Sequence, residues 1–66
     1  MKPAQDQIWE NELQGGLYTI IGVEIRDNYQ SVSYRRVGRE TIIHCHLATF
    51  LCRFRFVSER REQQEA

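Results

Sequence analysis

The sequence predicts an all-β fold, namely a small antiparallel barrel of four or five strands. The first observation behind this prediction is the segment 15–26, which is rich in β-branched and aromatic residues and lies between Gly15-Gly16 and Asp27-Asn28. The second is that further alternating segments follow, separated by tight turns. The third is the length of 66 residues, which allows one domain with a single compact core.

The strand at the centre of the predicted sheet covers residues 17–26. Its first half is apolar on both faces, and its second half alternates, with Ile21, Val23 and Ile25 on one face. A strand that is covered on both faces early and on one face later is typical of the middle of a small sheet. The segment 8–13 before it is expected to be a short strand or an irregular edge segment, anchored by Trp9.

Two more strands and one helical turn are predicted after the central strand. A strand over 29–37 is joined to it by a hairpin at Asp27-Asn28, and a strand over 40–46 follows the next tight turn. Residues 47–51 lose the period of two and have the apolar spacing of a single helical turn.

The last predicted strand covers residues 52–57, with Cys52, Phe54 and Phe56 facing inward. Short strands, tight turns and one helical turn before the final strand describe a small SH3-like barrel. Its predicted core consists of Ile21, Val23, Ile25, Val32, Tyr34, Ile43, Leu47, Phe50, Phe54 and Phe56.

The two ends of the chain are polar. Residues 1–7 contain Pro3 and show no periodicity, so they are expected to form a mobile arm. Residues 59–66 have no apolar stripe and are expected to form a flexible tail. The SH3-like β domain is therefore assigned to residues 8–58.

Two short patterns carry a resemblance to a known family. The run 16–23 has the form Gly-x-Tyr-x-apolar-x-Gly-Val, and Leu47-x-x-Phe50 precedes the final strand. These patterns resemble an uncharacterised bacterial family of short SH3-like domains of unknown function, over about residues 15–57. The sequence departs from the family in carrying His46 where the family has a proline. The resemblance implies a small β fold and no particular activity.

The charges are balanced in total but unevenly distributed. Residues 1–29 carry a net charge of −3, residues 30–61 carry +5 and residues 62–66 carry −2. Eight of the nine basic residues are Arg, which suits interfaces better than Lys because its guanidinium is planar and weakly hydrated. Arg35, Arg53 and Arg55 are predicted to face outward, and they would form one basic stripe if their strands share a sheet face. Such a stripe would suit nucleic acid.

The cluster His44-Cys45-His46 is the first candidate for chemistry. Both imidazoles point to one face of a strand, so His44, His46 and Cys52 are an alternative metal site, although a fourth ligand is lacking. We expect no metal and no cofactor, with the histidines on the outer face and the thiols acting as small apolar groups. No arrangement for nucleophilic or acid–base catalysis is recognisable, and the protein is not expected to be an enzyme.

The sequence therefore favours a small binding module that regulates or contacts another protein, with nucleic acid as the alternative partner. A chain of this kind fits a bacterial, phage or mobile-element origin, and free strand edges favour a homodimer. No segment could span a membrane and no signal peptide is recognisable, so a cytoplasmic location is expected. The residues expected to contact the partner are Trp9, Tyr29, Arg35, Arg36, Arg39, Arg53 and Arg55.

Overall fold

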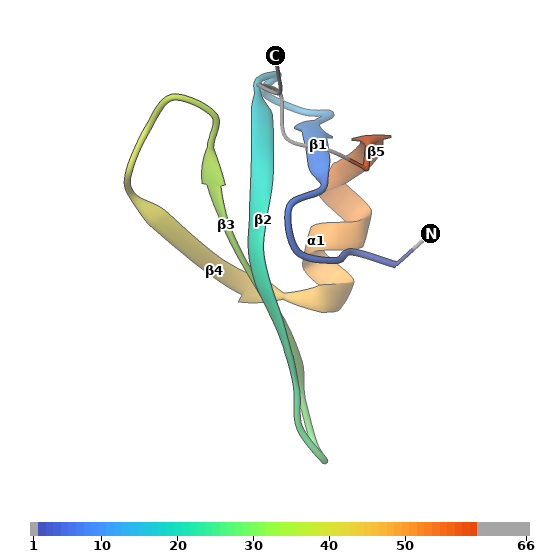
Figure 1. Ribbon diagram of the computed structural model, residues 1–66. Coiled ribbons are helices and arrows are strands. Elements are labelled where there is room, and N and C mark those ends of the chain that lie inside the picture. The colour runs from blue at the N-terminus through green and yellow to red at the C-terminus, as the bar shows by residue number, and fades with distance from the viewer. Residues whose placement is uncertain (1, 60–66) are drawn as a thin grey trace.

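The computed structural model describes residues 2–59 and confirms the all-β prediction (Figure 1). Five strands form one antiparallel sheet, and one short helix precedes the last strand. In chain order the elements are β1 (Ile8–Asn11), β2 (Leu17–Ile25), β3 (Gln30–Arg36), β4 (Ile42–His46), α1 (Leu47–Arg53) and β5 (Phe54–Ser58).

The strand order in the sheet is β4-β3-β2-β1-β5, which places β2 in the middle as predicted. The segment before β2 is a short strand, as one of the two alternatives predicted, but β1 pairs with both β2 and β5, so it is internal and the alternative of an irregular edge segment is wrong. The two ends of this order, β4 and β5, are not paired with each other, and the sheet therefore curls around the core without closing. Figure 1 shows the β2–β3 turn projecting beyond the other elements. The molecule as a whole measures 40 × 24 × 23 Å.

A β-bulge in the middle of β2 changes which side chains face inward. Ile20 pairs with Tyr34 and Gly22 pairs with Ser33, so Ile21 is the extra residue of the bulged strand. Before the bulge the even-numbered residues face the core, and after it the odd-numbered ones do. The bulge therefore explains why even-numbered positions of β2 are apolar before Ile21 and odd-numbered positions are apolar after it.

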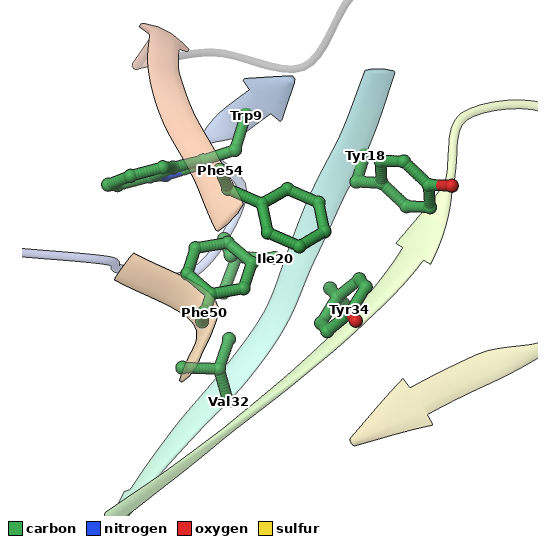
Figure 2. Close-up of a cluster of buried hydrophobic side chains, with 7 residues drawn as sticks. All are labelled: Trp9, Tyr18, Ile20, Val32, Tyr34, Phe50 and Phe54. Carbon is green, nitrogen blue, oxygen red and sulfur yellow. The ribbon is translucent and has the colours of Figure 1, made fainter. Parts of the chain in front are cut away.

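The core is an aromatic cluster enclosed by the curled sheet and α1 (Figure 2). Phe50 stacks on Phe54 with ring centroids 4.3 Å apart, and it meets Trp9 edge to face at 5.1 Å. Such ring pairs add to the free energy gained from burying the apolar area. The buried cluster consists of Trp9, Tyr18, Ile20, Val32, Tyr34, Phe50 and Phe54, with Val23, Cys45, Leu47 and Phe56 packed against it.

This core confirms part of the predicted list and corrects the rest. Val32, Tyr34, Phe50 and Phe54 are buried as predicted. Ile21 is half-buried at the bulge, Ile43 is exposed on β4, and Ile25 is 67% exposed because β2 has by then passed beyond the core. The prediction missed Ile8, Trp9, Tyr18 and Ile20, all of which are buried.

The helical turn predicted over 47–51 extends to Arg53. The amide of Phe54 still donates a hydrogen bond to the Phe50 carbonyl, so the final strand begins at Phe54. Cys52 consequently lies on an exposed part of α1, and the prediction that it faces inward from the last strand is wrong. No helix within residues 2–59 is long and apolar enough to cross a membrane.

The segment before β1 lies against the sheet. The amide of Asp6 donates to the Ile20 carbonyl at 2.9 Å, and the amide of Ile20 donates to the Gln7 carbonyl at 3.0 Å. Pro3 and Gln7 are buried, so this segment packs onto the domain that was assigned to residues 8–58. The mobility expected for residues 1–7 stays a prediction, and the predicted tail, apart from Glu59, lies outside the described residues.

Candidate functional site

Trp9 is a core residue, which contradicts the prediction that it contacts a partner. It is 3% exposed, its ring meets Phe50 and Phe56, and its indole N–H donates to the side-chain oxygen of Gln7 at 2.9 Å. A tryptophan buried with its N–H satisfied offers no surface to a partner.

The arginines predicted to form one stripe lie on different parts of the molecule. Arg35 is on β3 and Arg55 is on β5, with β2 and β1 between them in the sheet. Arg55 also pairs with Glu10, since its Nη2 lies 2.8 Å from Oε1 of that carboxylate. Arg53 is the last residue of α1 and lies outside the sheet altogether. The three guanidinium groups therefore do not form a continuous basic stripe.

Arg36 is the last residue of β3 and Arg39 lies in the turn that follows, and both take part in contacts within this region. The Arg36 guanidinium carbon lies 6.0 Å from the centroid of the Tyr18 ring and also covers Gly16. A Cβ atom at residue 16 would meet this guanidinium at 3.0 Å, and the φ of +95° there also favours glycine. Arg39 follows β3 in an exposed turn, where its carbonyl accepts a hydrogen bond from Arg35 at 2.9 Å.

The two histidines lie on the outer face of β4, as the alternation predicted. His44 Nδ1 is 2.8 Å from the Ser33 hydroxyl, and the His46 ring meets Tyr29 edge to face. Within residues 2–59 no group of three or more His, Cys, Asp or Glu side chains comes close enough to hold a metal ion. The structure therefore does not bring His44, His46 and Cys52 together.

The outer edge of β4 is the candidate binding site, because the hollows beside it are lined by the predicted contact residues Tyr29 and Arg53. β4 pairs only with β3 among the described strands, through a regular register of five residue pairs. Four of its five residues are exposed, including Ile42 and Ile43. Three surface hollows are lined in part by residues of this strand. An unpaired strand edge with hollows beside it is suited to bind an extended chain segment.

The largest of these hollows is a groove of about 650 Å³ between the β2–β3 turn and α1, here called the hairpin groove. His46 borders it at the end of β4, and exposed Tyr29 and Leu51 line its walls. Tyr29 is thus the one predicted contact residue that combines exposure, an aromatic ring and a place in a groove.

A smaller hollow lies on the outer face of the sheet beside the two histidines. Its volume is about 360 Å³, and its lining includes Glu24, Tyr29 and His44. Arg26 hydrogen-bonds Glu24 and holds the pKa of this exposed carboxyl below its usual range. The Glu24 carboxylate of this hollow is therefore already paired with Arg26.

The third hollow, here called the tyrosine pocket, has a volume of about 190 Å³ and lies at the opening between β4 and the α1–β5 junction. Its walls combine aromatic rings, amides and one guanidinium, and its lining contains no carboxylate. Tyr18 meets Tyr34 and Phe54 edge to face, with centroids 5.6 and 5.3 Å apart. The lining residues are Asn11, Leu13, Gln14, Tyr18, Tyr34, Ile43, Arg53 and Phe54.

Burial raises the pKa values of Tyr34, which lines this pocket, and of its neighbour Cys45. Burial raises the pKa of Tyr34 to about 12, and a side-chain hydrogen bond to Cys45 adds to this shift. Burial likewise raises the pKa of the Cys45 thiol. The pocket therefore presents the neutral phenol of Tyr34 beside the cationic Arg53 at physiological pH.

The raised pKa of Tyr34 predicts a loss of stability in alkali. Above pH 10 the unfolded chain releases the phenol proton while the native state keeps it, so the free energy of unfolding falls as pH rises. Two pKa units correspond to at most about 2.7 kcal/mol by pH 12. Urea denaturation from pH 8 to 12 should show this fall in the wild type and a smaller fall in Tyr34→Phe. The exposed Tyr29→Phe is the control, and equal slopes in all three proteins would contradict the prediction.

Sequence reasoning missed the tyrosine pocket, although its residues carry a weak signal. Tyr18 on β2 carries a hydroxyl and lies on the same sheet face as Tyr34 on the neighbouring strand. This shared face results from the bulged register of β2. Arg53 was assigned to the last strand, whereas the longer helix places it at the pocket. A comparison of the chain with protein-family models, curated proteins and solved structures finds no match.

Proposed function

We propose that the protein is a small non-enzymatic binding module whose partner is a protein. The partner supplies an extended segment that adds to the free edge of β4. The observation that carries this proposal is the exposed outer edge of β4, which has no strand partner within residues 2–59, together with hollows lined by residues near both ends of the strand. Main-chain hydrogen bonds along an added strand give affinity, and pockets for alternate side chains give specificity.

The dimensions of β4 limit the kind of segment that fits. Five residues of strand span about 17 Å, so the partner segment is short. Backbone pairing over that length gives modest affinity, and side chains entering the hairpin groove or the tyrosine pocket add to it. Tyr29 contributes from the groove at the His46 end of β4.

A homodimer is a competing use of the same edge, because two copies of β4 can pair with each other. Sedimentation of the purified chain at increasing concentration tests for this dimer directly. Nucleic acid has weaker support, because Arg35, Arg53 and Arg55 are dispersed and Arg55 is already paired with Glu10. Salt-dependent binding of an oligonucleotide pool would be the sign of this alternative partner.

The test of the proposed function uses linear peptides selected from a displayed random library on the immobilised protein. The selected peptides are then resynthesised with single backbone N-methyl groups. In an added strand, alternate amides face β4, so N-methylation should abolish binding at every second position and be tolerated between them.

Two results would contradict strand addition. One is a selected peptide whose binding does not depend on the position of the methyl group. The other is a library that yields no binder while an oligonucleotide pool binds with a steep dependence on salt, since that dependence is the signature of phosphate contacts. The variant Tyr29→Ser, with the exposed Leu17→Ser as control, then tests whether the hairpin groove takes part.

A further inference from the structure

We propose that the segment that adds to β4 carries an Asp or Glu opposite Ile43, and that its carboxylate enters the tyrosine pocket and pairs with Arg53. This inference rests on the proposed function, since it names the chemistry of the partner at the same site.

The register of the sheet directs one side chain of an added strand into this pocket. Ile43 pairs with Tyr34 across β3 and β4, and both side chains line the tyrosine pocket. Directly opposed residues of neighbouring strands point to the same face of a sheet. A residue opposite Ile43 on the free edge therefore points toward the pocket, about 4.8 Å further along the same row.

Arg53 and Asn11 each bring a hydrogen-bond donor to the pocket. No carboxylate within residues 2–59 forms an ion pair with Arg53, although the guanidinium lies close enough to influence the pKa of both Tyr34 and Cys45. The side-chain oxygen of Asn11 accepts hydrogen bonds from the amides of Leu13 and Gln14, both at 2.9 Å. Its amide nitrogen is the part of the carboxamide left to donate.

Tyr18 provides an independent indication of a ligand. It is 8% exposed, and within the described part of the chain its hydroxyl has no hydrogen-bond partner. Figure 2 shows this hydroxyl turned away from the aromatic cluster. A polar group at a largely buried position costs stability unless it is hydrogen-bonded, so a ligand atom in the pocket would satisfy it.

Charge and size select a carboxylate over other occupants. A cationic side chain would meet the Arg53 charge and a set of donors, and an apolar side chain would leave the Tyr18 hydroxyl unsatisfied. The volume of about 190 Å³ suits one side chain. A carboxylate accepts hydrogen bonds from a guanidinium in a bidentate geometry and has further lone pairs for a phenol and an amide.

The experiment repeats the peptide selection with charge-reversed protein. Wild-type protein should select peptides with Asp or Glu at one fixed position, and Arg53→Glu should replace this preference with Lys or Arg. Arg39→Glu makes the same change of charge at an exposed turn away from the pocket and should leave the preference unchanged.

Affinities of one selected acidic peptide provide the second measurement. Arg53→Gln should weaken its binding about tenfold or more, and Tyr18→Phe should weaken it about fivefold through the lost hydrogen bond. Circular dichroism confirms that each variant is folded, which is expected because Arg53 is exposed and Tyr18→Phe keeps the ring.

The outcomes separate the two proposals. The proposal that a carboxylate pairs with Arg53 is wrong if peptides bind by strand addition without an acidic preference. It is also wrong if Arg53→Glu leaves an acidic preference intact. In both cases the proposed function still holds. A preference of the wild-type protein for Lys at this position would also contradict the pairing of a carboxylate with Arg53. If no peptide binds in a manner sensitive to N-methylation, strand addition is wrong and the carboxylate is wrong with it.

Discussion

Phe50→Ala is expected to lower the free energy of unfolding by about 3–5 kcal/mol. Phe50 is fully buried, and its ring contacts those of Trp9, Tyr34 and Phe54 at centroid distances of 5.1, 5.3 and 4.3 Å. Removing the ring leaves a cavity bordered by α1 and several strands. Because a domain of this size typically has only about 3–10 kcal/mol of stability, the variant should be largely unfolded at 37 °C.

Urea denaturation followed by circular dichroism measures this effect. Leu51→Ala is the matched control, since Leu51 is the next residue of the same helix and is 46% exposed. Its cost should stay within about 0.5 kcal/mol, as for ordinary surface positions. Similar losses in the two variants would show that α1 does not place Phe50 in the core.

Gln7→Leu is expected to cost about 2–4 kcal/mol, although the sequence assigns Gln7 to a mobile arm. The side-chain oxygen of this buried residue accepts hydrogen bonds from the indole N–H of Trp9 and from the amide of Ala4, both at 2.9 Å. Leucine fills a similar volume but accepts no hydrogen bond, so the buried indole N–H of Trp9 and the partly buried amide of Ala4 both lose their partner. An unsatisfied donor in a buried position costs about 1–3 kcal/mol.

The control for this prediction is Gln5→Leu, because Gln5 is exposed in the same segment. Thermal unfolding should show a clearly lower midpoint for Gln7→Leu and an almost unchanged midpoint for Gln5→Leu. Equal midpoints would mean that residues 2–7 do not pack on the sheet in solution. This comparison therefore also tests the mobility that the sequence predicts for the N-terminal arm.

The functional proposals depend on where strands end and which strand edges remain open. β4 is a binding edge only because β5 pairs with β1 on the far side of the sheet. Arg53 faces the tyrosine pocket only because α1 runs to that residue. Neither feature follows from the local patterns of the sequence.

The sequence by itself determined the all-β fold, the approximate positions of β2 to β5 along the chain, the helical turn before the last strand and four of the buried residues. These features follow from local information, namely the period of two in 29–37 and 52–57, the turn residues between strands and the helical spacing of Leu47, Phe50 and Leu51. Local periodicity is enough because a side chain's face in a regular strand depends only on its neighbours.

Only the tertiary structure decided the phase of β2, the burial of Trp9 and the grouping of the candidate site. The bulge at Ile21 shifts the inward-facing set by one residue, and no local pattern marks an inserted residue. Trp9 is buried because β1 has a strand on each side, which a reading of its own short segment does not reveal. The same long-range pairing separates Arg35 from Arg55 and joins Tyr18, Tyr34 and Arg53, because strand order is set by contacts between residues distant in the chain.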